Sequence, residues 1–305
     1  MVRALIRKAG KRAIDLGIVR PSRRFARVGR AIRDVSGHVA AVSRLVDSER
    51  TFLANGRASR YDKATRASIV ERFRRIDQGI DIKTTPTDGL FLAEALLSVE
   101  SAGAIVECGC YNGGSTAKLS ILAELTGRHL FVFDSFEGLP DVDDYNRYDL
   151  HARRSLRWVR ARSWTAGQYA APLDVVKANV EKYGVLSRCT FVKGWFSETL
   201  HERLPPQIAF AFTDVDLPSS ARECLLHIWP RLSERGAFFS HDIAYIKVLQ
   251  EFNDEHLWKD VFRDHPPIFF GAGYGMGDSS PHLGFAVKGR VTAEYMKSLT
   301  FDKRS

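Results

Sequence analysis

Residues 84–305 alternate between short apolar runs and segments in which apolar residues recur at helical spacing. The apolar runs predict strands at 104–109, 129–134, 189–193, 208–214, 236–242, 261–270 and 283–288. The helical spacing predicts a helix after Thr85, with Pro86 at its first position and Asp88 near its positive end. A second helix is expected to begin at 115, and three more are expected at about 172–183, 219–229 and 244–257. Strands with so few charges must be covered on both faces. The pattern therefore predicts an α/β fold: a doubly wound, mostly parallel seven-stranded sheet with helices on both faces.

The N-terminal region differs from the rest of the chain in its charge. Residues 1–60 hold 15 Lys and Arg against 4 Asp and Glu, whereas residues 61–305 hold 30 against 32. Apolar residues recur at helical spacing between Val35 and Val46 and again between Ile69 and Ile76, so we expect residues 1–83 to form a basic helical extension before a domain at 84–305. Such a segment can oligomerise, lie on an anionic membrane or bind nucleic acid, and oligomerisation is favoured over the other two. A transit peptide over residues 1–30 is a further alternative.

Composition limits the compartment and the redox chemistry. No apolar run approaches the roughly 18–20 residues of a membrane span, and the N-terminus lacks the apolar core of a secretory signal. The four cysteines show no paired metal spacing and are expected to be reduced and structural. They are Cys108, Cys110, Cys189 and Cys224. We therefore expect a cytoplasmic protein, with peripheral contact at a membrane surface as an option for its basic N-terminus.

A glycine-rich turn follows the strand predicted at 104–109. That strand carries Glu107, and Gly109 and Gly113 let backbone approach a ligand closely before a helix begins at Ser115 and Thr116. The spacing is not the dinucleotide pattern G-x-G-x-x-G, so NAD is not expected. The strand at 129–134 then ends in Asp134, about 20 residues after the turn, where a carboxylate can accept both hydroxyls of a ribose. The turn indicates a nucleotide-type ligand; its alternative is a purely structural tight turn.

Three motifs within residues 85–255 carry a resemblance to a known family. They are Glu107-x-Gly109-x-x-x-Gly113-Gly114, Asp134-Ser135-Phe136-Glu137-Gly138-Leu139-Pro140 and Gly194-Trp195-Phe196-Ser197-Glu198-Thr199-Leu200. Together they resemble the macrocin O-methyltransferase group of S-adenosylmethionine-dependent enzymes. The resemblance implies a Rossmann-like domain, S-adenosylmethionine as cofactor, and an acceptor hydroxyl on a sugar, a glycosylated small molecule or a glycan.

The cofactor expectation assigns a role to each motif. We expect Glu107 to meet the methionine ammonium, Ser115 and Thr116 the carboxylate, and Asp134 the ribose; Trp195 either covers the adenine or lies in the core. The expected cofactor-binding residues are Glu107, Gly109, Tyr111, Gly113, Ser115, Thr116, Asp134, Ser135, Gly194, Trp195 and Asp214.

Acidic residues end two further predicted strands. Asp214 and Asp216 close the strand at 208–214, and His241 and Asp242 close the strand at 236–242. If the strands are adjacent and parallel their ends converge, so we expect Asp214, His241 and Asp242 to hold a divalent cation. The resemblance implies Mg²⁺ held by Asp-x-Asp and an Asp-Asp pair; His241 stands at the first position of that pair, and since imidazole suits Mn²⁺ and softer ions, Mn²⁺ or another ion is the alternative. Asp216 is alternatively a helix cap, and His241 a structural histidine or a general base.

The expected reaction uses the cation to polarise an acceptor hydroxyl and a base to remove its proton. The expected catalytic residues are Asp214 and His151; His151 lies in the long segment 135–170, which we interpret as a lid or substrate loop. Two other functions remain open at this stage. One is a sugar-nucleotide glycosyltransferase that uses Asp214-Val215-Asp216, and the other is a non-catalytic cofactor-binding protein. A homo-oligomer is expected from the N-terminal helices.

Overall fold

The computed structural model describes residues 43, 45–56, 60–150, 161–271, 282–290, 295 and 299. Residues from Ser48 onward form one compact unit, which begins before the boundary expected at residue 84. Within the described residues, no helix is both long and apolar enough to cross a membrane.

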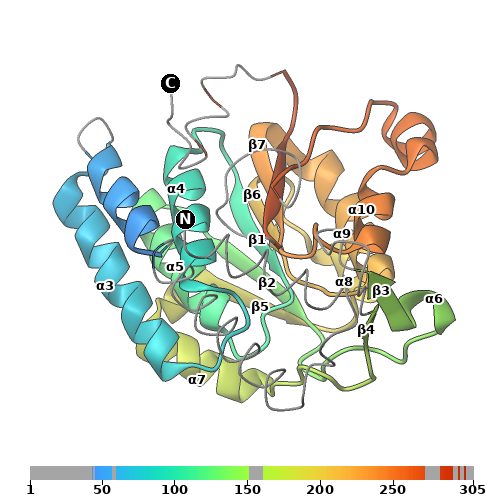
Figure 1. Ribbon diagram of the computed structural model, residues 1–305, viewed down its shortest axis with the longest axis horizontal. Helices are drawn as coiled ribbons and strands as arrows, with labels where there is room; N and C mark the ends of the chain where they lie inside the picture. Colours follow the sequence, from blue (N-terminus) through green and yellow to red (C-terminus); the bar gives the residue numbers. More distant parts are fainter. Residues whose placement is uncertain are drawn as a thin grey trace, which may run out of the picture. The chain divides into compact units, whose positions relative to one another are not determined.

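The core of this unit is a seven-stranded sheet with the order β5-β2-β1-β6-β7-β9-β8 (Figure 1). Its members are β1 (Ala104–Cys108), β2 (Leu130–Asp134), β5 (Cys189–Lys193), β6 (Ile208–Thr213), β7 (Leu232–Ser240), β8 (Phe270–Gly271) and β9 (Gly284–Val287). Neighbours from β5 to β7 are parallel, and β9 runs antiparallel to both β7 and β8. The predicted Rossmann-like, doubly wound α/β architecture is confirmed.

The strand order reverses between β1 and β6. The chain builds outward from β1 through β2 to β5 and then returns to place β6 on the other side of β1. The carboxyl ends of β1 and β6 therefore lie side by side at the switch point, where doubly wound sheets bind their ligands. The register of the sheet aligns the ends of the three central strands, because Cys108 at the end of β1 pairs with Phe133 of β2 on one side and with Thr213 of β6 on the other.

Helices cover both faces of the sheet (Figure 1). One layer contains α3 (Lys63–Gly79), α4 (Pro86–Ser98), α5 (Gly114–Thr126) and α7 (Leu173–Tyr183), and the other contains α8 (Phe196–Arg203), α9 (Pro218–Arg231) and α10 (Ile246–Phe252). The apolar face expected between Ile69 and Ile76 is buried in α3, which packs against α4 and α5 of the same chain. The expected start of α4 is confirmed as a capping box, in which Thr85 accepts from the Asp88 amide and the Asp88 side chain accepts from the Thr85 amide.

The prediction of a strand at 261–270 is wrong over most of that range. Residues Leu257–Phe262 form a helical turn, and only Phe270–Gly271 joins the sheet as β8. The segment contains Pro266 and Pro267, which have no N–H group to offer to a ladder, so pairing starts after them. The helix predicted over 244–257 is also shorter than expected, because α10 ends at Phe252.

The long segment after β2 has local structure of its own. It contains α6 (Asp144–Arg147) and an antiparallel pair formed by β3 (Tyr148–Leu150) and β4 (Ala161–Ser163). The two ends of the segment are joined by backbone bonds, from the Leu139 amide to the Gln168 carbonyl at 2.9 Å and from the Gly167 amide to the Leu139 carbonyl at 2.8 Å. The two ends of the segment therefore lie next to each other, beyond the carboxyl end of β2.

Candidate active site

A cavity of about 710 Å³ lies where β1, β2, β6 and β7 end. Ten of the residues expected at the site line it: Gly109, Tyr111, Ser115, Asp134, Ser135, Gly194, Trp195, Asp214, His241 and Asp242. Three others, Glu107, Gly113 and Thr116, are buried and do not line it. His151 lies outside the described residues.

The turn after β1 is built for close backbone contact. Gly109 has φ +81°, and a Cβ there would lie 2.0 Å from the carbonyl oxygen of Asp214 on the neighbouring strand end. Gly113, also at φ +81°, is the N-cap of α5, and no side chain caps that helix. The N–H groups of the first turn of α5 therefore stay available to an anionic group beside Ser115.

Glu107 lies buried in β1 under this turn. Neither of its carboxylate oxygens has a hydrogen-bond partner among the described residues. Burial raises the pKa of Glu107 to about 8, while the nearby hydroxyls of Ser115 and Thr116 act in the opposite direction. A buried acid without a partner is costly, and a cationic group brought in by a ligand would remove the cost.

Asp134 is held rigidly at the end of β2. Its Oδ2 accepts from the Cys110 amide at 2.7 Å, and its Oδ1 accepts from the Phe136 amide at 2.7 Å. The carboxylate thereby ties the glycine turn to the following loop and faces the cavity. Each oxygen retains a second lone pair, so the group can still accept two further hydrogen bonds.

The residues that follow β5 form another part of the cavity wall. Gly194 has φ +143°, and Trp195 and Phe196 are both half-buried and line the cavity. Phe196 also packs against the hydrophobic core, whereas Trp195 is the N-cap residue of α8. The structure thus places Trp195 on the cavity wall, where an aromatic face suits a purine.

Asp214, His241 and Asp242 come together as expected, with one ligand atom of each within 4.8 Å of the others. His241 Nδ1 lies 3.3 Å from Asp214 Oδ1, and its Nε2 lies 3.5 Å from Asp88 Oδ2. Burial alone would lower the pKa of His241, but Asp214 and Asp88 raise it well above its usual value.

Asp242 has partners of its own in this cluster. Its Oδ2 accepts from the amides of Val215 and Asp216, at 2.8 and 2.9 Å. Burial and the neighbouring Asp214 raise the pKa of Asp242 to about 7. Asp242 therefore holds the loop between β6 and α9 in place.

The donor set departs from the one that Mg²⁺ prefers. His241 Nε2 faces Asp88 and Nδ1 faces Asp214, so an imidazole whose N–H is directed to Asp88 could turn the lone pair of Nδ1 toward a cation beside Asp214. Mg²⁺ prefers carboxylate, carbonyl and water oxygens in near-octahedral geometry, and imidazole is a poor substitute.

The family model of the macrocin O-methyltransferases (TylF) matches residues 92–263. The chain belongs to this family. The resemblance carried by the three motifs is thereby confirmed, and so is the enzyme class, a methyltransferase.

Two curated O-methyltransferases resemble the chain in sequence. The 8-demethyl-8-(2,3-dimethoxy-alpha-L-rhamnosyl)-tetracenomycin-C 4'-O-methyltransferase of Streptomyces olivaceus is 34% identical over 215 residues, which is 68% of this chain and 74% of that protein. The demethyldecarbamoylnovobiocin O-methyltransferase of Streptomyces niveus is 28% identical over 166 residues, 52% of this chain and 59% of that protein. The solved structure of the O-methyltransferase NovP superposes with a TM-score of 0.50 at 18% identity, covering 72% of this chain and 80% of that one, and supports the fold.

The sequence analysis did not anticipate the roles of three residues at or beside the cavity of this macrocin O-methyltransferase family member. Asp88 belongs to the helix start expected from the sequence, and its Oδ2 also lies 3.5 Å from His241 Nε2. Asp216 was offered as a helix cap, which is wrong: Leu217 is the N-cap of α9, no side chain caps it, and Asp216 lies on the cavity wall with φ +60°. His282 also lines the cavity, and its ring stacks on that of His241 with centroids 5.6 Å apart. A positive φ at a non-glycine residue cannot be read from sequence, and the Asp88 and His282 contacts are long-range.

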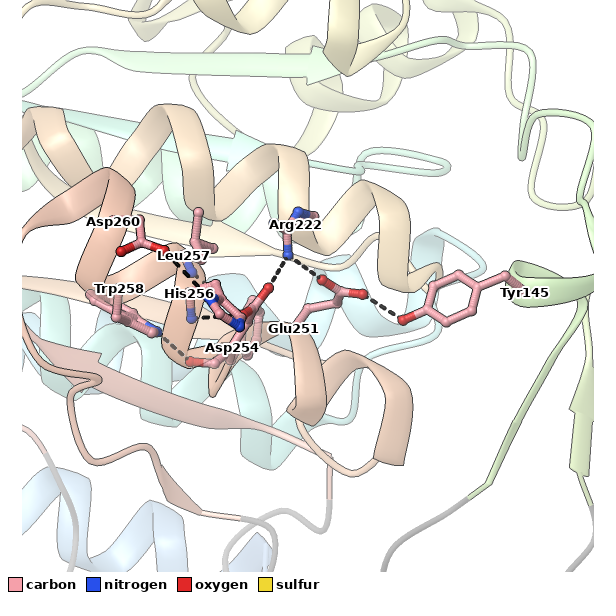
Figure 2. A network of polar contacts seen from close by, with 9 residues as sticks. Tyr145, Arg222, Glu251, Asp254, His256, Leu257, Trp258 and Asp260 are labelled. Carbon is pink, nitrogen blue, oxygen red and sulfur yellow. Dashed lines mark hydrogen bonds and ion pairs between the residues drawn. The ribbon is translucent and has the colours of Figure 1, made fainter.

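The segment between β2 and β4 is fastened to α9 and α10 beside the cavity. The Tyr145 hydroxyl donates to Glu251 Oε1 at 2.5 Å, and Arg222 donates from Nη1 to Glu251 Oε2 at 2.9 Å and to Asp254 Oδ2 at 2.6 Å (Figure 2). Next to Tyr145, Asn146 Oδ1 accepts from the amide of Ser219, a residue of the cavity wall, at 3.1 Å. These contacts hold the segment against the α9 side of the cavity.

Proposed function

We propose that this chain transfers the methyl group of S-adenosylmethionine to a hydroxyl of a sugar or of a glycosylated small molecule. The observation that carries the proposal is one cavity in which a glycine turn, the carboxylate of Asp134 and the acidic end of β6 face the same space. The Streptomyces olivaceus relative, named as a 4'-O-methyltransferase of a rhamnosyl tetracenomycin, supports a sugar hydroxyl as acceptor.

The cofactor fits the wall formed by β1, β2 and β5. We assign the methionine ammonium to Glu107, the carboxylate to the first turn of α5, and the ribose hydroxyls to Asp134. What supports the first assignment is the buried, unpartnered carboxylate of Glu107. What supports the last is the pair of oxygens that Asp134 presents to the cavity while its orientation is fixed by two amides. We assign Trp195 to the adenine.

The chemistry needs alignment and one proton transfer. The acceptor oxygen attacks the methyl carbon; the O–CH₃ bond forms as the S–CH₃ bond breaks, and the sulfur keeps the electron pair and becomes the thioether of S-adenosylhomocysteine. The hydroxyl proton passes to a base. Holding two reactants in line can lower the activation free energy by roughly 7–11 kcal/mol in well-oriented systems. A cavity that binds both the methyl donor and the acceptor can therefore supply much of the rate enhancement by alignment alone.

The base must be a cavity carboxylate or imidazole with room to accept a proton. Asp214 is paired with His241, and Asp242 is occupied by the amides of Val215 and Asp216. Asp216 also lines the cavity, where it is half-buried, and its carboxylate is our candidate for the base. His151, the base expected from sequence, remains an alternative outside the described residues.

Other parts of the sequence-based hypothesis stay predictions. A divalent cation at Asp214, His241 and Asp242 is supported by their closeness, and the imidazole among the donors favours Mn²⁺ or another ion over Mg²⁺. A homo-oligomer and contact of the basic N-terminus with a membrane have no support in the described residues. The glycosyltransferase alternative is not favoured, because the family match accounts for Asp214-Val215-Asp216 within a methyltransferase.

A direct assay tests the proposal. Purified protein is incubated with S-adenosylmethionine and a panel of rhamnosides and other deoxysugar glycosides, and products are sought by mass spectrometry. We expect addition of one methyl group to at least one glycoside, loss of product in Asp216→Asn, and normal product in Glu181→Gln, an exposed carboxylate on α7. Methylation that survives Asp216→Asn would reassign the base. Absence of product across the panel, together with absence of S-adenosylhomocysteine formation, would refute the function.

A further inference from the structure

We infer that Lys83, in the linker between α3 and α4, binds the carboxylate of the methionine part of the cofactor. The inference rests on the proposed function and deepens it, because that function assigns the carboxylate to the first turn of α5 and gives it no cationic side chain. The ligand group concerned is the amino-acid end of the methyl donor, which carries a carboxylate and an ammonium group.

The linker between α3 and α4 is fastened to the glycine turn that follows β1. The Tyr111 hydroxyl donates to Asp81 Oδ2 at 3.0 Å, and Asn112 donates from Nδ2 to the main-chain carbonyl of Asp81, also at 3.0 Å. Tyr111 itself has φ +45°, so the turn holds its side chain in a conformation that few residues other than glycine adopt. The start of the linker therefore lies against the turn that leads into α5.

Lys83 lies close to the first turn of α5. Gly114 is the first residue of that helix, and a Cβ on it would collide with Cγ2 of Ile82, so the linker packs directly on the helix start. Lys83 follows Ile82, and its Nζ lies 5.1 Å from the centroid of the Tyr111 ring. Lys83 and Ser115 both line the cavity. The Lys83 ammonium and the N–H groups at the start of α5 therefore flank the same end of the cavity.

The charge of the described cavity wall makes this lysine distinctive. Among the described residues that line the cavity, Lys83 is the one Lys or Arg. The same wall carries five carboxylates: Asp134, Asp214, Asp216, Glu223 and Asp242. A ligand carboxylate is repelled by acids at close range and stabilised by a nearby cation. The carboxylate of the methyl donor is therefore best placed beside Lys83.

The structure of the ligand leads to the same place. Its ammonium and its carboxylate are bonded to one carbon atom, so their partners must face one part of the cavity. Glu107, the partner proposed for the ammonium, is buried under the glycine turn, with the hydroxyls of Ser115 and Thr116 near its carboxylate. The carboxylate of the ligand then falls at the start of α5, next to the linker. Helix N–H groups and a lysine ammonium together form charge-assisted hydrogen bonds with such a group.

Lys83 is not committed to another strong partner. Its Nζ forms an ion pair with Asp81 at 2.9 Å, but the side chains are 46% and 63% exposed, and an ion pair so open to solvent contributes little to stability. An ammonium group has three N–H donors on a flexible stem, so Lys83 can bind a ligand carboxylate while it keeps Asp81 or after it leaves it.

A comparison of two ligands isolates the contact. S-adenosylhomocysteine carries the carboxylate, whereas S-adenosyl-3-thiopropylamine lacks it and keeps the ammonium. Both are titrated by calorimetry into wild type, Lys83→Met, Lys83→Arg and the control Lys182→Met, which changes an exposed lysine on α7. We expect Lys83→Met to weaken binding of S-adenosylhomocysteine by at least about tenfold and binding of the amine by less than about twofold. Lys83→Arg should keep most of the affinity, and Lys182→Met should bind both ligands as wild type does.

The outcomes separate the inference from the proposed function. Equal losses for the two ligands would overturn the inference, because they would show a structural effect of the substitution, and unchanged binding of S-adenosylhomocysteine by Lys83→Met would overturn it as well. Added NaCl should weaken S-adenosylhomocysteine binding more in wild type than in Lys83→Met, and equal salt dependence would also contradict the contact. Failure of wild type to bind S-adenosylhomocysteine at all would overturn the proposed function and the inference together.

Discussion

Replacing Glu107 by Gln should stabilise the protein in the absence of cofactor. The carboxyl is fully buried in β1, has no hydrogen-bond partner among the described residues, and has its pKa raised from 4.5 to about 8 by burial. Below pH 4.5 the group is protonated in both the folded and the unfolded chain and has no effect on the pH dependence. Between pH 4.5 and about 8 the unfolded chain ionises while the folded chain stays protonated, so stability is lost as pH rises through this window.

The size of the effect follows from the shift. Each pKa unit corresponds to about 1.4 kcal/mol, so the free energy of unfolding falls by roughly 3 kcal/mol at pH 7 and roughly 5 kcal/mol above pH 8. Gln keeps the shape of the side chain and cannot ionise. The difference in stability between Glu107→Gln and wild type should therefore be small at pH 4.5, grow through pH 7, and level off above pH 8.

Urea denaturation of wild type, Glu107→Gln and the exposed control Glu181→Gln at pH 5, 7 and 9 measures this directly. Parallel pH profiles in wild type and Glu107→Gln would refute the reasoning. The same substitution should weaken S-adenosylhomocysteine binding, and wild type should release a proton on binding at pH 7, because the cofactor ammonium favours ionised Glu107. Calorimetry in two buffers of different ionisation enthalpy reports that proton, and equal heats in the two would contradict the assignment of the ammonium.

Three further predictions concern neighbouring parts of the structure. Gly109→Ala should abolish S-adenosylhomocysteine binding in calorimetry, because its Cβ would lie 2.0 Å from the Asp214 carbonyl oxygen at a φ of +81°; unchanged affinity would contradict the close approach. Lys118→Met should lower the free energy of unfolding by about 3 kcal/mol in urea denaturation, since it leaves Asp77, now 2.5 Å from Lys118 Nζ, largely buried without its partner; Arg75→Met, in an exposed pair with Glu71, should cost less than about 1 kcal/mol. Tyr145→Phe removes the hydroxyl bonded to Glu251 (Figure 2) and, because Tyr145 is 47% exposed, should raise the acceptor KM by no more than about fivefold while leaving cofactor affinity unchanged; a matching loss of cofactor affinity would show that the segment supports both ligands.

Local signals in the sequence were sufficient for much of the fold. The start of α4 follows from Thr85, Pro86 and Asp88, which satisfy its first N–H groups without help from the rest of the chain. The strands that carry Glu107 and Asp134 were found because both are apolar, short and bounded by polar turns. The prediction of a strand at 261–270 is wrong because Pro266 and Pro267 have no N–H group for a ladder, so pairing begins only at Phe270.

The electrostatics of the site could not be predicted in the same way. Asp88 and His241 are far apart in the sequence, and only the packing of α4 against the sheet edge brings the carboxylate to the imidazole. The sequence suggested a metal because it showed Asp214, His241 and Asp242 at strand ends, but it did not show that Asp88 contacts His241 from the other side. A contact between residues so far apart in the chain, such as Asp88 with His241, has no signal in the local periodicity of the sequence.

Calorimetric titration with S-adenosylhomocysteine, on wild type and Asp134→Ala, tests the central claim most directly. Wild type should bind with micromolar affinity, and Asp134→Ala, which removes the carboxylate proposed for the ribose, should lose binding by at least about tenfold while remaining folded by circular dichroism. Absence of binding to wild type, or equal binding by wild type and Asp134→Ala, would contradict the account of the cavity as a methyl-donor site.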